Sequence, residues 1–142
     1  MAARRTQVVR DISATPDEVW ALLADVNGWA EWNPTIISIE GASVPGTKVK
    51  LVSTLSPKRT FTLSVDDVEP PRRMVWSDGM PLGLFTGRRT YTVEPSSSGA
   101  VFTMVEEYSG PMAGLIIRSI PDLSESFDAF AEGLKIAAEA GD

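Results

Sequence analysis

Residues 100–135 read AVFTMVEEYSGPMAGLIIRSIPDLSESFDAFAEGLK, and this stretch holds the two patterns that decide the fold. Side chains alternate with a period of two up to Ser109, which predicts a β-strand over 100–109. After Gly110-Pro111 the period becomes helical, and it predicts one long amphipathic helix. Pro121 predicts a kink or break near Ser119-Ile120, because proline lacks the N–H that a helix interior needs. The apolar stripe of this helix is Ile116, Ile120, Leu123, Phe127, Phe130 and Leu134.

The segment before this stretch is dominated by short strand-like runs. Turn residues, mainly Pro, Gly and Ser, separate these runs at short intervals, which is typical of an antiparallel sheet. A β-bulge near Asp66-Asp67 is expected, because otherwise Val68 would face away from the side that buries Val65. The predicted strands cover residues 36–40, 48–55, 59–68, 73–77, 86–94 and 100–109, with turns that include 78–83 and 95–99.

The N-terminal part predicts one strand and two short helices. A β-type run covers 6–12, and Thr15 follows it as a helix cap with Glu18 completing a capping box. The first helix ends near Asn27-Gly28, and residues 29–32 are long enough for one further turn. We expect Trp29 and Trp32 to pack that turn against the edge of the sheet, with a place in the wall of a cavity as the alternative.

The order of elements predicts an α+β architecture in a single domain over 1–142. The predicted order is one strand, two short helices, a six-stranded meander and a long helix. In such an order the long amphipathic helix must cover one large sheet. We therefore expect an antiparallel sheet of about seven strands wrapped around the C-terminal helix. A strongly twisted sheet around a single helix leaves space beneath the helix wherever side chains do not meet, so a cavity is expected there.

The composition excludes several classes of function. Cys and His are both absent, which removes the Ser-His-Asp triad, the Cys nucleophile and zinc sites of the Cys/His kind. We expect no metal and no cofactor. A net charge of −6 opposes the binding of nucleic acid, which depends on Lys and Arg displacing counterions. No apolar run approaches membrane-spanning length, so we expect a cytoplasmic protein without stable membrane insertion.

Several motifs, taken in order, resemble those of the helix-grip superfamily. These motifs are ATPDEVW at 14–20, WAEWNP at 29–34, EPPRRMVW at 69–76, residues 87–95 and EEYSGPM at 106–112. The superfamily includes the START lipid-transfer domains, the birch-pollen-allergen proteins and the bacterial polyketide cyclase/dehydrase-like (SRPBCC) proteins. Relatives with this pattern often have His at the position of Arg89, facing the Glu at 106. The acid–base chemistry of those relatives therefore does not carry over directly to Arg89 and Glu106.

The candidate site lies on the face of the sheet that turns toward the helix. On the last strand the bulk of Phe102, Met104 and Tyr108, together with the resemblance, favours this face for Glu106 as well. On the preceding strand Arg89 and Tyr91 then face the same interior. The loop 78–85 is apolar and rich in glycine, so it suits a gate over a pocket or a packed loop that closes the sheet end. The predicted ligand-binding residues are Leu51, Leu63, Trp76, Leu84, Phe85, Arg89, Tyr91, Phe102, Met104, Glu106, Tyr108 and Phe127.

Arg89 and Glu106 are charged residues, and the assignment of these strand faces points both side chains toward the interior. Such groups are unfavourable in an apolar site unless they pair with each other or with a ligand. They either anchor a polar group of the ligand, act as an acid–base pair, or form a cross-strand ion pair that meets no ligand.

Three functions follow as alternatives. The leading one is non-covalent binding or transport of a hydrophobic small molecule such as a lipid, a polyketide or an aromatic metabolite. The second is a cofactor-free polyketide aromatase/cyclase or dehydratase with Glu106 as base and Tyr91, Tyr108 or Arg89 stabilising an enolate. The third is a protein-interaction module similar to the chaperone-activating members of the superfamily. We expect a monomer or a weak homodimer.

Overall fold

The computed structural model describes residues 4–141, so residues 1–3 and 142 of the predicted domain lie outside the described part. Its elements, apart from single 3₁₀ turns, follow the predicted order. They are β1 (Arg4–Ile12), α1 (Pro16–Ala24), α2 (Trp29–Trp32), β2 (Ile36–Glu40), β3 (Lys48–Ser53), β4 (Phe61–Glu69), β5 (Arg73–Met80), β6 (Phe85–Ser96), β7 (Gly99–Ser109), α3 (Ala113–Ile116) and α4 (Ser124–Ala140).

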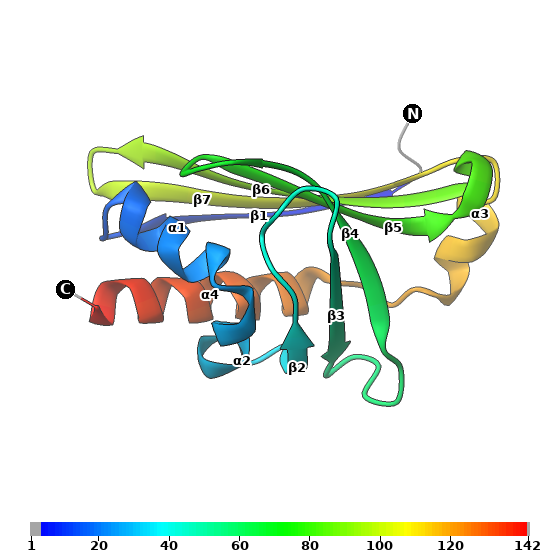
Figure 1. The fold of residues 1–142 in the computed structure, drawn as a ribbon, viewed down its shortest axis with the longest axis horizontal. Helices are drawn as coiled ribbons and strands as arrows, with labels where there is room; N and C mark the ends of the chain where they lie inside the picture. The colour runs from blue at the N-terminus through cyan, green and yellow to red at the C-terminus, as the bar shows by residue number, and fades with distance from the viewer. Residues whose placement is uncertain (1–3, 142) are drawn as a thin grey trace.

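The seven strands form one antiparallel sheet in the order β1-β7-β6-β5-β4-β3-β2. Figure 1 shows this sheet as one curled layer with α4 running beneath it, and with α3 at the end of the molecule opposite the C-terminus. The first strand pairs with the last, so the sequence neighbours β1 and β2 lie at opposite edges. This arrangement confirms the α+β helix-grip architecture.

The predicted bulge in β4 is confirmed. The register with β5 shifts between Val65, which pairs with Trp76, and Asp67, which pairs with Val75. Val65 is buried on the side of the helix, whereas the Asp67 carboxylate accepts a hydrogen bond from Arg73 at 2.8 Å. The extra residue keeps the apolar side chains of both halves of the strand on the inner face.

Three connections between strands differ from the prediction. The turn expected at 78–83 is shorter, because Asp78, Gly79 and Met80 continue β5 and pair with Gly87, Thr86 and Phe85. The turn expected at 95–99 also shortens, since Pro95 still lies opposite Ala100. The strands expected over 48–55 and 59–68 are shorter where they face each other, because β3 ends at Ser53 and β4 begins at Phe61. Local turn hydrogen bonds from Ser56 N to Ser53 O and from Arg59 N to Ser56 O occupy the backbone between them.

The C-terminal helical region is broken where proline predicts a break. Residues 113–119 form α3 and a 3₁₀ turn, Ile120 is extended, and α4 begins only at Ser124. Within α4 the predicted stripe is confirmed as the buried face, whereas Ile120 in the broken segment is only partly buried. The Arg4 guanidinium donates to the carbonyls of Ile120 (3.1 Å) and Pro121 (2.7 Å), so it ties this segment to β1. Among residues 4–141 no helix is long and apolar enough to span a membrane.

The predicted capping box is present at the start of α1. Thr15 Oγ1 accepts a hydrogen bond from the Glu18 backbone N–H at 3.1 Å, and Glu18 Oε1 accepts one from the Thr15 N–H at 2.8 Å. Both bonds satisfy backbone donors that the helix itself leaves unpaired.

We expect Thr15→Ala to lower the free energy of unfolding by about 1 kcal/mol, because one of these two bonds is lost. Urea denaturation at equilibrium measures the change. Thr60→Ala, at an exposed position between β3 and β4, is the control and should leave the value within about 0.5 kcal/mol of wild type. Equal stability of the two variants would show that the cap contributes nothing.

Candidate functional site

The site is built around an ion pair on neighbouring strands. Arg89 of β6 lies directly opposite Glu106 of β7, and its Nε donates to Glu106 Oε1 at 2.7 Å. The hydroxyl of Tyr108 donates to the other carboxylate oxygen, Oε2, at 2.5 Å. From α4, the ring of Phe127 lies under the guanidinium with 4.9 Å between Arg89 Cζ and the ring centroid. Both oxygens of Glu106 therefore hold a donor, and one face of Arg89 is covered by an aromatic ring.

This cluster is desolvated but not sealed. The side chain of Arg89 is 27% exposed and that of Glu106 is 14% exposed. Burial works to lower the pKa of Arg89, but the charge and hydrogen bond of Glu106, with smaller contributions from the two tyrosines, outweigh it and the net shift is upward. Burial, followed by the charge of Glu106, raises the pKa of Tyr108. The guanidinium thus stays protonated and the phenol stays neutral at physiological pH.

Several hydrogen-bond donors around the pair have no acceptor. Nε donates the one hydrogen bond of ordinary geometry that Arg89 makes within residues 4–141, while the guanidinium also lies close to the Tyr91 hydroxyl and its Nη atoms remain open to solvent. The Trp76 indole N–H, on the inner face of β5, is buried without an acceptor, and the Tyr91 hydroxyl, on the same face of β6, is buried beside Arg89. An unpaired buried donor is unfavourable. The groups of this site that are open to a ligand are mainly donors, because guanidinium and indole N–H groups cannot accept.

Around Phe130 of α4, aromatic rings fill the interior. Trp29 stacks on Trp76 with ring centroids 4.9 Å apart, and it meets Tyr91 edge-on at 5.7 Å. Phe130 of α4 closes the cluster against Trp29 at 5.2 Å and against Phe102 at 5.9 Å. The sequence predicts a cavity beneath the helix. Around Phe130 that space is filled by aromatic rings, so the prediction does not hold in this part of the interior.

Trp29 is the residue whose place the sequence interpretation misjudged. Instead of packing the short helix at the sheet edge, Trp29 is 1% exposed in the centre of the molecule, and its indole N–H donates to Leu23 O at 3.0 Å. A signal for this was present, since Val26 and Trp29 continue the helical spacing of the apolar residues of α1.

The predicted ligand-binding residues divide into three groups, and their contact with a ligand stays a prediction. Trp76, Tyr91, Phe102 and Met104 lie in the packed interior. Arg89, Glu106, Tyr108 and Phe127 form the cluster described above. The third group is less buried. In it Leu51, Leu63 and Phe85 are half-buried, and Leu84 is 39% exposed in the hairpin turn. We call Leu51, Leu63, Phe85 and the ion-pair cluster the open end.

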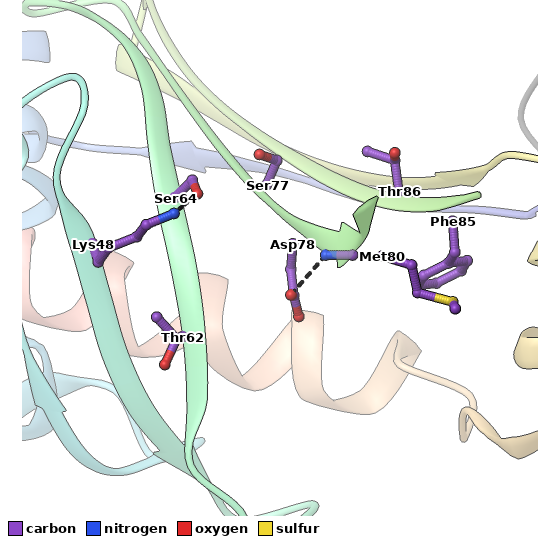
Figure 2. Close-up of a pocket in the computed structure, with 9 residues that line it drawn as sticks. Lys48, Thr62, Ser64, Ser77, Asp78, Met80, Phe85 and Thr86 are labelled. Atoms are coloured by element: carbon purple, nitrogen blue, oxygen red, sulfur yellow. Dashed lines mark hydrogen bonds between the residues drawn. The ribbon is translucent and has the colours of Figure 1, made fainter. Parts of the chain in front are cut away.

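A hollow of about 280 Å³ adjoins this open end where β4 and β5 separate beyond the pair Ser64–Ser77 (Figure 2). Phe85 belongs to its wall and also stacks on Tyr108 at 5.6 Å, so the hollow and the cluster share a side chain. A second hollow lies along β2 and β3. Neither hollow is lined by a residue of α4. The other walls of the first are Lys48, Thr62, Ser64, Ser77, Asp78, Gly79, Met80 and Thr86.

Residues 4–141 contain no cluster of three or more acidic side chains that is arranged to hold a metal ion. The open end therefore presents apolar side chains and the oriented N–H donors of Arg89 to a ligand.

The sequence of nearly the whole chain matches one protein family. Residues 3–139 fit the family described as polyketide cyclase/dehydrase and lipid transport. The chain belongs to this family. A search of curated proteins finds no match.

Solved structures with the same fold share little sequence with this chain. A protein from Mesorhizobium loti aligns over 98% of this chain and 99% of its own with a TM-score of 0.74 and 18% identity. The Zhui aromatase/cyclase from a Streptomyces species aligns over 96% and 93% with a TM-score of 0.74 and 16% identity. A START superfamily protein from Mycobacterium smegmatis aligns over 97% and 99% with a TM-score of 0.71 and 12% identity. At these identities the likeness shows the fold.

Proposed function

We propose that the protein binds a hydrophobic small molecule at the open end, with Arg89 as the polar anchor. The observation that carries this proposal is the state of Arg89. Its guanidinium is oriented by Glu106 and Phe127, is mostly removed from water, and still presents unpaired N–H groups. A desolvated cation with free donors is unfavourable unless another acceptor reaches it.

The surroundings suit an apolar ligand with one polar group. Leu51, Leu63 and Phe85 supply half-buried apolar surface, and Phe127 supplies a ring. Small-molecule sites are typically apolar walls with a few well-placed polar groups. A lipid, a polyketide and an aromatic metabolite all meet this description. The aromatic rings behind the cluster limit the depth that such a ligand reaches without moving side chains.

Binding is favoured over proton transfer by the contacts of Glu106. A general base must offer an oxygen to the proton that it removes. Each Glu106 oxygen already accepts one hydrogen bond, from Arg89 or from Tyr108, so removal of a proton from a ligand by this carboxylate would compete with the bonds that hold the guanidinium. A protein-interaction role would call for one contiguous apolar surface apart from the site. The exposed apolar side chains lie on different elements instead, with Leu82 and Leu115 beside the open end and with Val9 and Ile136 on β1 and α4.

Arg89→Lys tests the anchor with little disturbance of the fold. Lysine keeps a positive charge next to Glu106 but lacks the planar fork that presents further N–H groups outward. We expect its affinity for acetylnaphthalene, an apolar probe with one carbonyl oxygen, to fall about tenfold in a fluorescence titration. Arg88→Lys, at the next position on the exposed outer face of β6, should bind as wild type does.

Native mass spectrometry of the freshly purified protein, with organic extraction of the same sample, identifies any natural ligand. A stoichiometric apolar compound would support the proposal. Unchanged probe affinity in Arg89→Lys, or no saturable probe binding to the wild type, would contradict it.

A further inference from the structure

The free atoms of the open end define which chemical group a ligand must bring. Glu106, the only carboxylate in the cluster, uses both oxygens on Arg89 and Tyr108. The groups open to a ligand are the Nη N–H groups of Arg89, with the Trp76 N–H and the Tyr91 hydroxyl on the same face. A guanidinium can only donate, so a ligand group that meets Arg89 must be a hydrogen-bond acceptor.

The charge of the cluster decides between a neutral and an anionic acceptor. Arg89 and Glu106 cancel each other at 2.7 Å, and both neighbouring tyrosines are neutral because their pKa values are raised above the ordinary value. A ligand carboxylate that reached the Nη groups would gain attraction to Arg89 but would also lie close to the Glu106 carboxylate. Two carboxylates in one partly desolvated site repel each other strongly.

The nearby charges outside the cluster do not change this balance. Arg4 already donates to the carbonyls of Ile120 and Pro121. Asp78, on the same face of β5, is exposed and adds negative charge at the rim. Lys48, the cation in the wall of the adjoining hollow, donates to Ser64 Oγ at 2.7 Å, on the face of β4 opposite to that of the buried Val65.

We propose that Glu106 is a specificity-determining residue, which makes the open end selective for a neutral acceptor oxygen, such as that of a ketone, ester or amide on an apolar body, and excludes carboxylates. This inference rests on the proposed binding function and adds the chemical class of the ligand's polar group. Glu106 acts through its charge and through the orientation of Arg89, and its role does not require contact with the ligand.

The test compares acetylnaphthalene with naphthoate on the wild type and on Glu106→Gln. Glutamine keeps the shape and an acceptor for Arg89 but removes the negative charge, so the cluster becomes a net cation. We expect the preference for naphthoate relative to the ketone to rise by about tenfold or more in Glu106→Gln. The measured quantity is the ratio of the two probe affinities in Glu106→Gln divided by the same ratio in the wild type. The different hydrophobicity of the two probes cancels in this quantity. Glu107→Gln removes the same charge from the outer face of β7 and should leave the ratio unchanged.

Wild-type protein alone provides an independent measurement should Glu106→Gln fail to fold. Naphthamide and naphthoate have almost the same shape, and the neutral amide is expected to bind about tenfold more tightly or better. An unchanged ratio in folded Glu106→Gln, or equal binding of amide and carboxylate to the wild type, would overturn the inference while leaving the binding function standing. If none of the probes binds the wild type, the proposed function itself fails.

Discussion

Trp29→Ala is expected to lower the free energy of unfolding by about 3–5 kcal/mol, the typical loss for a fully buried tryptophan. Trp29 is 1% exposed, stacks on Trp76 and packs edge-on against Phe130. Its removal leaves an apolar space between α2, the sheet and α4 that these rigid rings do not fill by collapsing. It also leaves Leu23 O without its donor.

Chemical denaturation of Trp29→Ala and Trp32→Ala separates this role from a general loss of a large side chain. Trp32 is only half-buried, so its removal should have a clearly smaller effect. Added indole should raise the melting temperature of Trp29→Ala and not that of the wild type, because an apolar cavity of this shape takes an apolar ring. A loss below about 1 kcal/mol for Trp29→Ala would show that the interior is not packed as described.

Gly133→Ala is expected to destabilise the protein by about 1–3 kcal/mol, although alanine is the better helix former. A Cβ at position 133 would lie 2.3 Å from Trp32 O, at the end of α2, and 3.0 Å from Pro34 Cδ, just after it. The helix α4 passes so close to this backbone that no side chain fits. Either α4 or the segment that carries Trp32 must shift.

Gly114→Ala is the matched control for this substitution. Gly114 lies in α3, and a Cβ there meets no atom within 4 Å. Its replacement should leave stability unchanged or raise it by up to about 1 kcal/mol, following helix propensity alone. Thermal unfolding of both variants shows whether the change in stability is negative for Gly133→Ala and zero or positive for Gly114→Ala. If Gly133→Ala were as stable as Gly114→Ala, the close approach of α4 to α2 would be wrong.

Local rules were sufficient to predict most elements of the fold. The capping box of Thr15 and Glu18, the break at Pro121 and the bulge after Val65 each follow from one or two side chains and their immediate neighbours. The end of β5 did not follow in this way. Gly79 and Met80 have the composition of a turn, but pairing with Thr86 and Phe85 on β6 extends the strand, and pairing depends on the partner strand.

The candidate site shows the same limit. The alternation in β7 and the offset across the hairpin placed Arg89 and Glu106 on one inner face, and the structure confirms that they contact each other. That Tyr108 takes the second carboxylate oxygen, and that Trp29 fills the space behind Trp76, depends on side-chain packing between elements distant in sequence. A period of two or of 3.6 contains no information on such packing.

The most direct test of the account follows the Arg89 guanidinium itself. NMR signals of the arginine side-chain N–H groups are recorded during a titration with acetylnaphthalene, with the rings of Phe85 and Phe127 as neighbouring reporters. The account predicts saturable shifts of Arg89 and of both rings, with no change at Arg88 on the outer face. Binding that leaves the Arg89 signals unchanged, or that shifts only residues around Lys48 and Thr62 in the hollow of Figure 2, would contradict it.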